Sequence, residues 1–104
     1  MNESEIRLKA TLRLHDDVAS YRKSGWRTVC EFEHTVFPDG SRLVGFEATL
    51  LDRDRLKPGE EGLVEMRFWV PRDDFREVRA GTPFECKEGT KLVASGRVLE
   101  ILGD

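Results

Sequence analysis

The stretch FECKEGTKLVASGRVLEIL, residues 84–102, is the most informative part of the sequence about the fold. Two apolar-rich segments, 84–87 and 92–102, flank Glu-Gly-Thr, and Gly89 gives the backbone the freedom that a tight turn needs. The pattern predicts an antiparallel hairpin of two strands near the end of the chain. Gly96 lies inside the second strand, and a hairpin of this kind accommodates an interior glycine.

The rest of the chain also has the two-residue period of β-strands. Residues 6–15 show it most clearly, because Ile6, Leu8, Ala10, Leu12 and Leu14 alternate with polar side chains. Further strands are predicted at 26–37, 42–51 and 63–70, and polar loops at 16–25, 52–62 and 72–83. Pro-Asp-Gly at 38–40 predicts a turn between two antiparallel strands. Six short strands with turns between them indicate an all-β barrel or sandwich.

The composition describes a single, highly charged domain. Of 104 residues, 38% are hydrophobic and 36% are charged, with a net charge of −3. We expect one domain over residues 1–104, with residues 1–5 as a flexible N-terminus. No apolar run approaches membrane-spanning length, so we expect a soluble cytoplasmic protein without a membrane partner. Cys30 and Cys86 fit buried thiols, or a single bridge if their strands are neighbours.

Three motifs resemble the C-terminal barrel of the elongation factor Tu family. In the hairpin, the family pattern is matched by Phe84, Glu88, Gly89, Val93, Gly96, Val98 and Leu102, and Lys87 and Lys91 stand where the family has arginine. LKPGEEGLVEMRFWVP, residues 56–71, resembles the family's Met-Pro-Gly-Asp-Asn segment and the strand after it. SGWRTVCEF, residues 24–32, matches a third motif at Gly25, Arg27 and Phe32, with Trp26 in place of tyrosine. The motifs occur in the family's order over most of residues 6–102.

The resemblance implies a six-stranded antiparallel closed barrel, an arrangement that leaves no sheet edge unpaired. It does not imply GTP binding, because the chain has no phosphate-binding loop of the type Gly-x-x-x-x-Gly-Lys-Ser/Thr. In the family this barrel contacts the T-stem backbone of tRNA. The resemblance therefore suggests an RNA-binding module, and the following residues would carry it: Arg27, Lys87, Glu88, Gly89 and Lys91. The chain departs from the family at Val29 and Glu33, neither of which donates a hydrogen bond to a phosphate.

The sequence holds no constellation typical of an enzyme. His15 and His34 are the only histidines, and neither forms a metal-ligand motif with the acidic residues beside it. The cysteines occupy positions that suit buried residues, whereas a reactive thiolate needs an exposed, electropositive setting. We therefore predict no catalytic residue, no cofactor and no metal site.

Trp69 is the strongest candidate for a binding residue. If Val64, Met66, Phe68 and Val70 fill the core, Trp69 points outward beside Arg67. An exposed tryptophan next to an arginine is typical of an interface anchor. The leading hypothesis is a non-enzymatic, stand-alone barrel that binds a protein partner through Arg67, Trp69 and Phe75, near the 72–82 loop. Two alternatives are that Trp69 packs beneath this loop and that the chain binds RNA.

Overall fold

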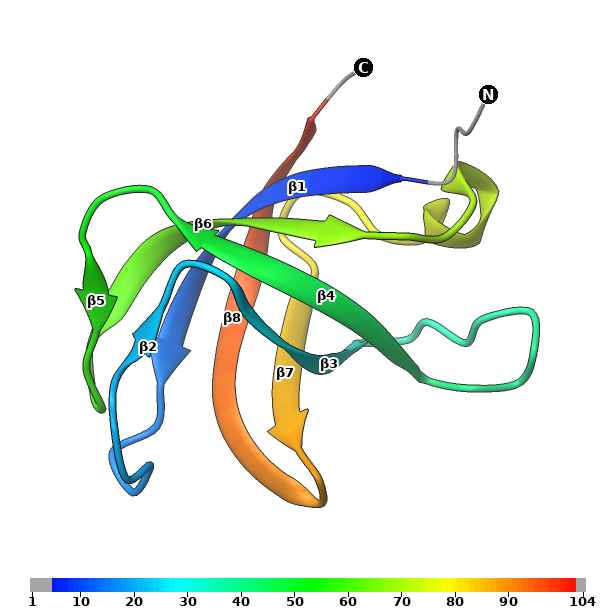
Figure 1. The fold of residues 1–104 in the computed structure, drawn as a ribbon. Helices are drawn as coiled ribbons and strands as arrows, with labels where there is room; N and C mark the ends of the chain where they lie inside the picture. Colours follow the sequence, from blue (N-terminus) through cyan, green and yellow to red (C-terminus); the bar gives the residue numbers. More distant parts are fainter. Residues whose placement is uncertain (1–4, 103–104) are drawn as a thin grey trace.

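Six antiparallel strands close on themselves in the computed structural model of the chain, which describes residues 5–102 (Figure 1). The barrel strands are β1 (Ile6–Leu14), β3 (Trp26–Phe32), β4 (Leu43–Leu50), β6 (Glu61–Phe68), β7 (Pro83–Glu88) and β8 (Lys91–Leu102). They are paired in the order β1-β6-β4-β3-β7-β8, with β8 returning to β1. The predicted six-stranded closed barrel is confirmed. The predicted flexible N-terminus lies outside the described residues except for Glu5.

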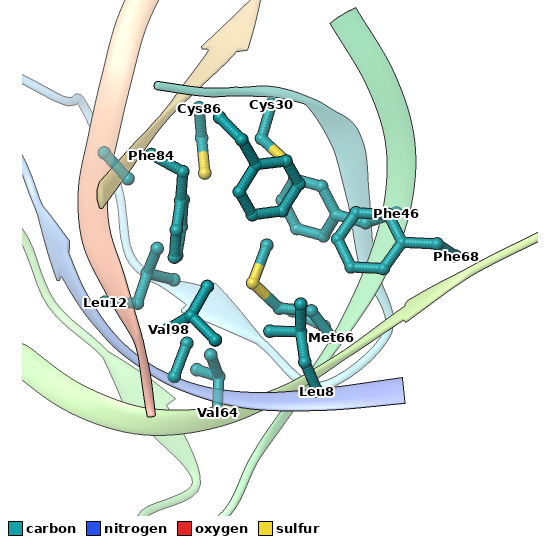
Figure 2. Packing of buried hydrophobic residues seen from close by; sticks show 14 of the residues in the cluster. Leu8, Leu12, Cys30, Phe46, Val64, Met66, Phe68, Phe84, Cys86 and Val98 are labelled. Carbon is teal, nitrogen blue, oxygen red and sulfur yellow. The ribbon is translucent and has the colours of Figure 1, made fainter. Parts of the chain in front are cut away.

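The barrel interior is filled by the apolar side chains that alternate along the strands. The five apolar residues of β1 are all buried, with exposed fractions of 1% or less. Phenylalanines from several strands meet in the same core, with neighbouring ring centroids 4.8 to 6.0 Å apart. Figure 2 shows Phe46, Phe68 and Phe84 among the packed aliphatic and sulfur-containing side chains. Because β1, β4 and β6 contribute every second residue to the core, the odd-even pattern of their sequence determines which of their residues face solvent.

One predicted strand is shorter than its sequence suggests. The prediction of a strand over 26–37 is wrong beyond Phe32, where β3 ends. The Thr35 amide donates to the Phe32 carbonyl at 3.3 Å, and His34 adopts a φ of 60°, so the chain turns. The predicted turn at 38–40 is present, with the Gly40 amide donating to the Phe37 carbonyl at 2.8 Å. This turn lies within the loop of residues 33–42, which connects β3 to β4.

Two predicted loops contain a small sheet. β2 (Arg22–Lys23) lies in the predicted loop 16–25, and β5 (Arg55–Leu56) lies in the predicted connection 52–62. These two strands pair antiparallel with each other outside the barrel. Leu56 is fully buried, so the small sheet is anchored on the core. The sequence pattern missed it because two-residue strands have no measurable period.

The segment after β6 closes one end of the barrel. Residues 72–83, predicted as a loop, contain the 3-10 helix η1 (Arg72–Phe75). Phe75 is only 4% exposed, and its ring lies 4.8 Å from that of Phe68 and 5.7 Å from that of Phe37. The prediction that Phe75 lies on an outward, partner-binding face is therefore wrong. An apolar residue in a short polar loop looked exposed, whereas tertiary packing buries it.

The cysteines lie directly opposite each other on neighbouring strands. Cys30 of β3 and Cys86 of β7 are Cα partners in the antiparallel register. Both side chains are buried and both thiols are free, as the buried-thiol interpretation predicted (Figure 2). The sequence left open a disulfide bond between Cys30 and Cys86, and these two described residues do not form one. Within residues 5–102, no helix has the length and apolar character needed to cross a membrane.

Candidate functional site

Trp69 is the first residue after β6 and lies on the outside of the barrel. Phe68 before it is buried in the core, so the alternation of the strand turns Trp69 outward. Its exposed fraction is 46%, which is high for a side chain of this size. The outward orientation predicted from the sequence is confirmed. The alternative, in which the 72–82 loop covers this side chain, does not hold.

Arg27 of β3 reaches Trp69 from across the sheet. Its guanidinium carbon lies 5.6 Å from the centre of the indole ring, within the range of a cation–π contact. The same guanidinium is 3.5 Å from the Glu47 carboxylate, and the Arg27 side chain remains 70% exposed. The structure thus brings together a residue predicted for RNA binding and one predicted for protein binding.

A hollow of about 420 Å³ lies beside these two side chains. Its lining includes outward residues of β3 and β4 and the two residues that follow β6, and most of it is apolar. Gly45 of β4 faces Val29 of β3 in the register and contributes no side chain, which leaves the space open. We call the following set the Trp69 surface: Arg27, Val29, Gly45, Trp69 and Val70.

The hollow forms because β4 and β6 separate at this point. Their register pairs Leu50 with Val64 and continues as far as Glu47 with Arg67. One further step along each outward row would place Gly45 opposite Trp69, but no pairing joins these two described residues. Figure 1 shows β4 and β6 diverging toward the end of β6. Gly45 was not predicted as part of a site, although a glycine inside a strand is a known sign of a local irregularity.

Arg67, the third predicted partner-binding residue, lies next to the Trp69 surface and not in the hollow. It faces outward between Arg7 of β1 and Glu47 of β4 in the register. Its Nε atom is 3.4 Å from the Glu5 carboxylate, without the geometry of a hydrogen bond. Arg67 is therefore part of a charged row that borders the hollow.

The hairpin residues predicted to bind RNA are paired with neighbouring acids and bases. The Lys87 ammonium is 3.7 Å from the Glu31 carboxylate, and the Lys91 ammonium is 3.8 Å from the Asp17 carboxylate. Gly89 forms the turn with a φ of 64°. The structure does not bring Arg27 into this group, since its guanidinium lies against Trp69. The hairpin tip thus carries balanced charge.

Glu88 holds together three segments that are distant in the sequence. Arg22 of β2 donates to both carboxylate oxygens, at 3.1 Å from Nε and 2.7 Å from the terminal nitrogen. The Trp26 indole nitrogen also donates to this carboxylate, at 2.7 Å. Burial raises the pKa of Glu88, but the hydrogen bonds from Arg22 and Trp26 outweigh it and leave the pKa below its ordinary value. Glu88 therefore fixes β2 and the start of β3 to the hairpin.

A larger hollow of about 640 Å³ lies on another face, over β1, β3, β7 and β8. It is lined by side chains of both charges, including Glu61, Glu85, Arg42 and Arg97. Arg42 lies 4.0 Å from Glu31, and Arg97 donates to the Gly81 carbonyl at 2.9 Å. Among residues 5–102, no three histidine, cysteine or acidic side chains gather in a way that could hold a metal ion. We find no reactive arrangement in this hollow.

A comparison of the chain with protein-family models gave no match, and a comparison with curated proteins gave none either.

Proposed function

We propose that this chain is a non-enzymatic barrel that binds a protein partner through the Trp69 surface. The observation that carries the proposal is the exposed indole of Trp69, which contacts Arg27 and, together with it, lines an apolar hollow. Tryptophan and arginine are the side chains most enriched at interface hot spots. A hollow beside them provides the pocket into which a partner's anchor residue fits.

The charge distribution favours a protein over RNA as the partner. Binding to a phosphate backbone depends on lysine and arginine side chains that gain more from phosphate than from their own neighbours. Here Lys87, Lys91 and Arg27 each lie within 4 Å of a carboxylate of this chain. The Trp69 surface has an apolar centre with charge at its border, which is the usual composition of a protein interface.

The proposal also covers the family relationship of the chain and its location in the cell. We propose that the chain is a relative of the C-terminal barrel of elongation factor Tu, on the strength of the three matching motifs and of the barrel topology. The free thiols of Cys30 and Cys86 support a cytoplasmic location, since reducing compartments keep thiols unpaired.

Site-specific photocrosslinking in the cells that produce the chain tests this function. Leu43, outward on β4 and 42% exposed, is replaced by benzoylphenylalanine, so that the reactive group lies close to Gly45. The control places the same group at Leu99 of β8, which is 41% exposed. We expect one discrete crosslinked protein from position 43, none from position 99, and loss of the product when Trp69→Ala is added. Equal products from both positions, or a product insensitive to Trp69→Ala, would overturn the proposal.

A further inference from the structure

The backbone of β4 presents hydrogen-bonding groups toward β6 at every second residue. On the side of β4 that faces β6, the Leu51 amide donates to the Leu63 carbonyl at 2.9 Å. On the side that faces β3, the Ala48 carbonyl accepts a hydrogen bond from the Gly25 amide at 2.8 Å. In an antiparallel strand these directions alternate residue by residue. The odd-numbered residues of β4 therefore direct their N–H and C=O groups toward β6. Gly45 belongs to this set.

Gly45 lies where β6 has already turned away. The last pair toward β6 is Glu47 with Arg67, and within residues 5–102 no backbone hydrogen bond joins Gly45 to Trp69 or Val70. On its other side, Gly45 pairs with Val29 of β3, so this part of β4 is a firm strand with one open edge. A barrel that is closed elsewhere thus has a short unpaired edge at residues 43–46.

This edge lacks the features that normally prevent strand addition. Proteins protect open edges with lysine, proline, bulges or covering loops. Residues 43–46 are Leu-Val-Gly-Phe, without charge or proline, and Gly45 is exposed. The hollow of the Trp69 surface lies over this same glycine. A donor, an acceptor and an apolar pocket therefore occur at one residue.

We infer that an extended segment of the protein partner adds to β4 at residues 43–46, hydrogen bonding to the N–H and C=O of Gly45. One of its large apolar side chains enters the hollow between Val29 and Trp69. This inference rests on the proposed function and specifies how the partner binds. An extended peptide is the occupant because its backbone offers an acceptor and a donor in the register of a strand.

The probe is a random peptide library displayed on phage, selected on the wild-type chain after depletion on the Trp69→Ala variant. Selected peptides are then synthesised, and amide hydrogen exchange of the chain is followed by NMR with and without peptide. In the free chain we expect fast exchange at Gly45 and slow exchange at Glu47, whose amide faces its pairing partner on β6. With peptide bound, we expect exchange at Gly45 to become slow.

Two variants at the same position isolate the backbone hydrogen bond. Gly45→Pro removes the N–H that faces the open edge and leaves the pairing with β3 intact, since proline is tolerated at strand edges. Gly45→Ala keeps this N–H, and its Cβ would meet only the Thr28 carbonyl oxygen, at 3.8 Å. We expect Gly45→Pro to weaken peptide binding roughly tenfold relative to Gly45→Ala, in line with the loss of one backbone hydrogen bond.

The outcomes separate this inference from the function on which it rests. Peptides that need Trp69 and slow the exchange of Gly45 would support both. Peptides that need Trp69 but leave Gly45 in fast exchange, and bind the Pro and Ala variants equally, would overturn strand addition and leave the Trp69 surface as the binding site. Recovery of no peptide that depends on Trp69 would overturn both. The exchange measurement uses the wild-type chain, so it decides the matter even if Gly45→Pro fails to fold.

Discussion

The Phe84 ring of β7 packs against Gly96 of β8, and a methyl group on Gly96 would lie 2.7 Å from the ring carbon Cζ. The same methyl group would clash with the carbonyl oxygen of Thr11 on β1. At Gly96, therefore, β8 lies close to both the β1 backbone and the Phe84 side chain of β7. This contact explains the interior glycine of the stretch 84–102.

Gly96→Ala should destabilise the fold, because the backbone of β1 cannot move without disturbing the barrel. We expect a loss of about 1–3 kcal/mol in the free energy of unfolding, the usual range for an overpacked core. Gly45→Ala is the matched control and should be close to neutral, since its Cβ meets only ordinary contact distance. Urea denaturation measures both. Equal stability of the two variants would contradict the close approach at Gly96.

The period-two segments were sufficient to predict an all-β barrel or sandwich, and the errors occurred where contacts between distant residues override the local pattern. The alternation in β1 and β6 gave the core residues correctly, because a half-buried strand allows one orientation of its side chains. The end of β3 at Phe32 depends on the turn at His34, which no local apolar pattern marks. Phe75 is buried by rings from three other segments, so its local sequence could not reveal its environment.

Only part of the candidate site, the outward side chain of Trp69, was predicted from the sequence. The alternation along β6 was enough to turn Trp69 outward. The contact of Trp69 with Arg27 requires the register of β3, β4 and β6 together, which only the folded chain supplies. Gly45 carried a readable signal, an interior glycine in a strand, but its partner across the sheet was unknown.

Trp69 and Phe75, grouped together from the sequence, should respond differently to truncation. Trp69→Ala removes a side chain that is 46% exposed, and we expect the free energy of unfolding to fall by less than about 1 kcal/mol. Phe75→Ala removes a core ring and should cost about 3–5 kcal/mol. Thermal or urea denaturation of both variants measures this difference. A large loss for Trp69→Ala would mean that this indole serves the fold.

The Glu88 carboxylate should make the stability depend on pH in the acid range. Its pKa in the folded chain lies below the ordinary value of 4.5, so the unfolded chain takes up a proton first as the pH falls. The contribution of Glu88 is therefore complete above about pH 4.5 and is lost as the pH drops through the folded-state pKa. Glu88→Gln should be less stable at neutral pH and lose less stability on acidification. Parallel pH profiles for variant and wild type would contradict this assignment.

The two thiols should be unreactive in the folded chain. Burial, and to a lesser degree the neighbouring Cys86, raises the pKa of the Cys30 thiol, and burial also raises the pKa of Cys86. We expect iodoacetamide at mildly alkaline pH to leave both residues unmodified until urea unfolds the chain, as judged by mass spectrometry. A Thr49→Cys variant, exposed on the outer face of β4, should react at once and serves as the control. Rapid modification of native Cys30 or Cys86 would show that the barrel opens at β3 and β7.

The central claim is that the chain binds a protein through the Trp69 surface, and affinity capture from its own cells tests it most directly. The wild-type chain and the Trp69→Ala variant are used in parallel, each at low and at high salt, and the eluates are analysed for protein and RNA. Our account predicts one protein that the wild type retains in both washes and that Trp69→Ala loses. RNA that is retained equally by both chains at low salt and released at high salt would contradict it, because phosphate contacts weaken steeply with salt.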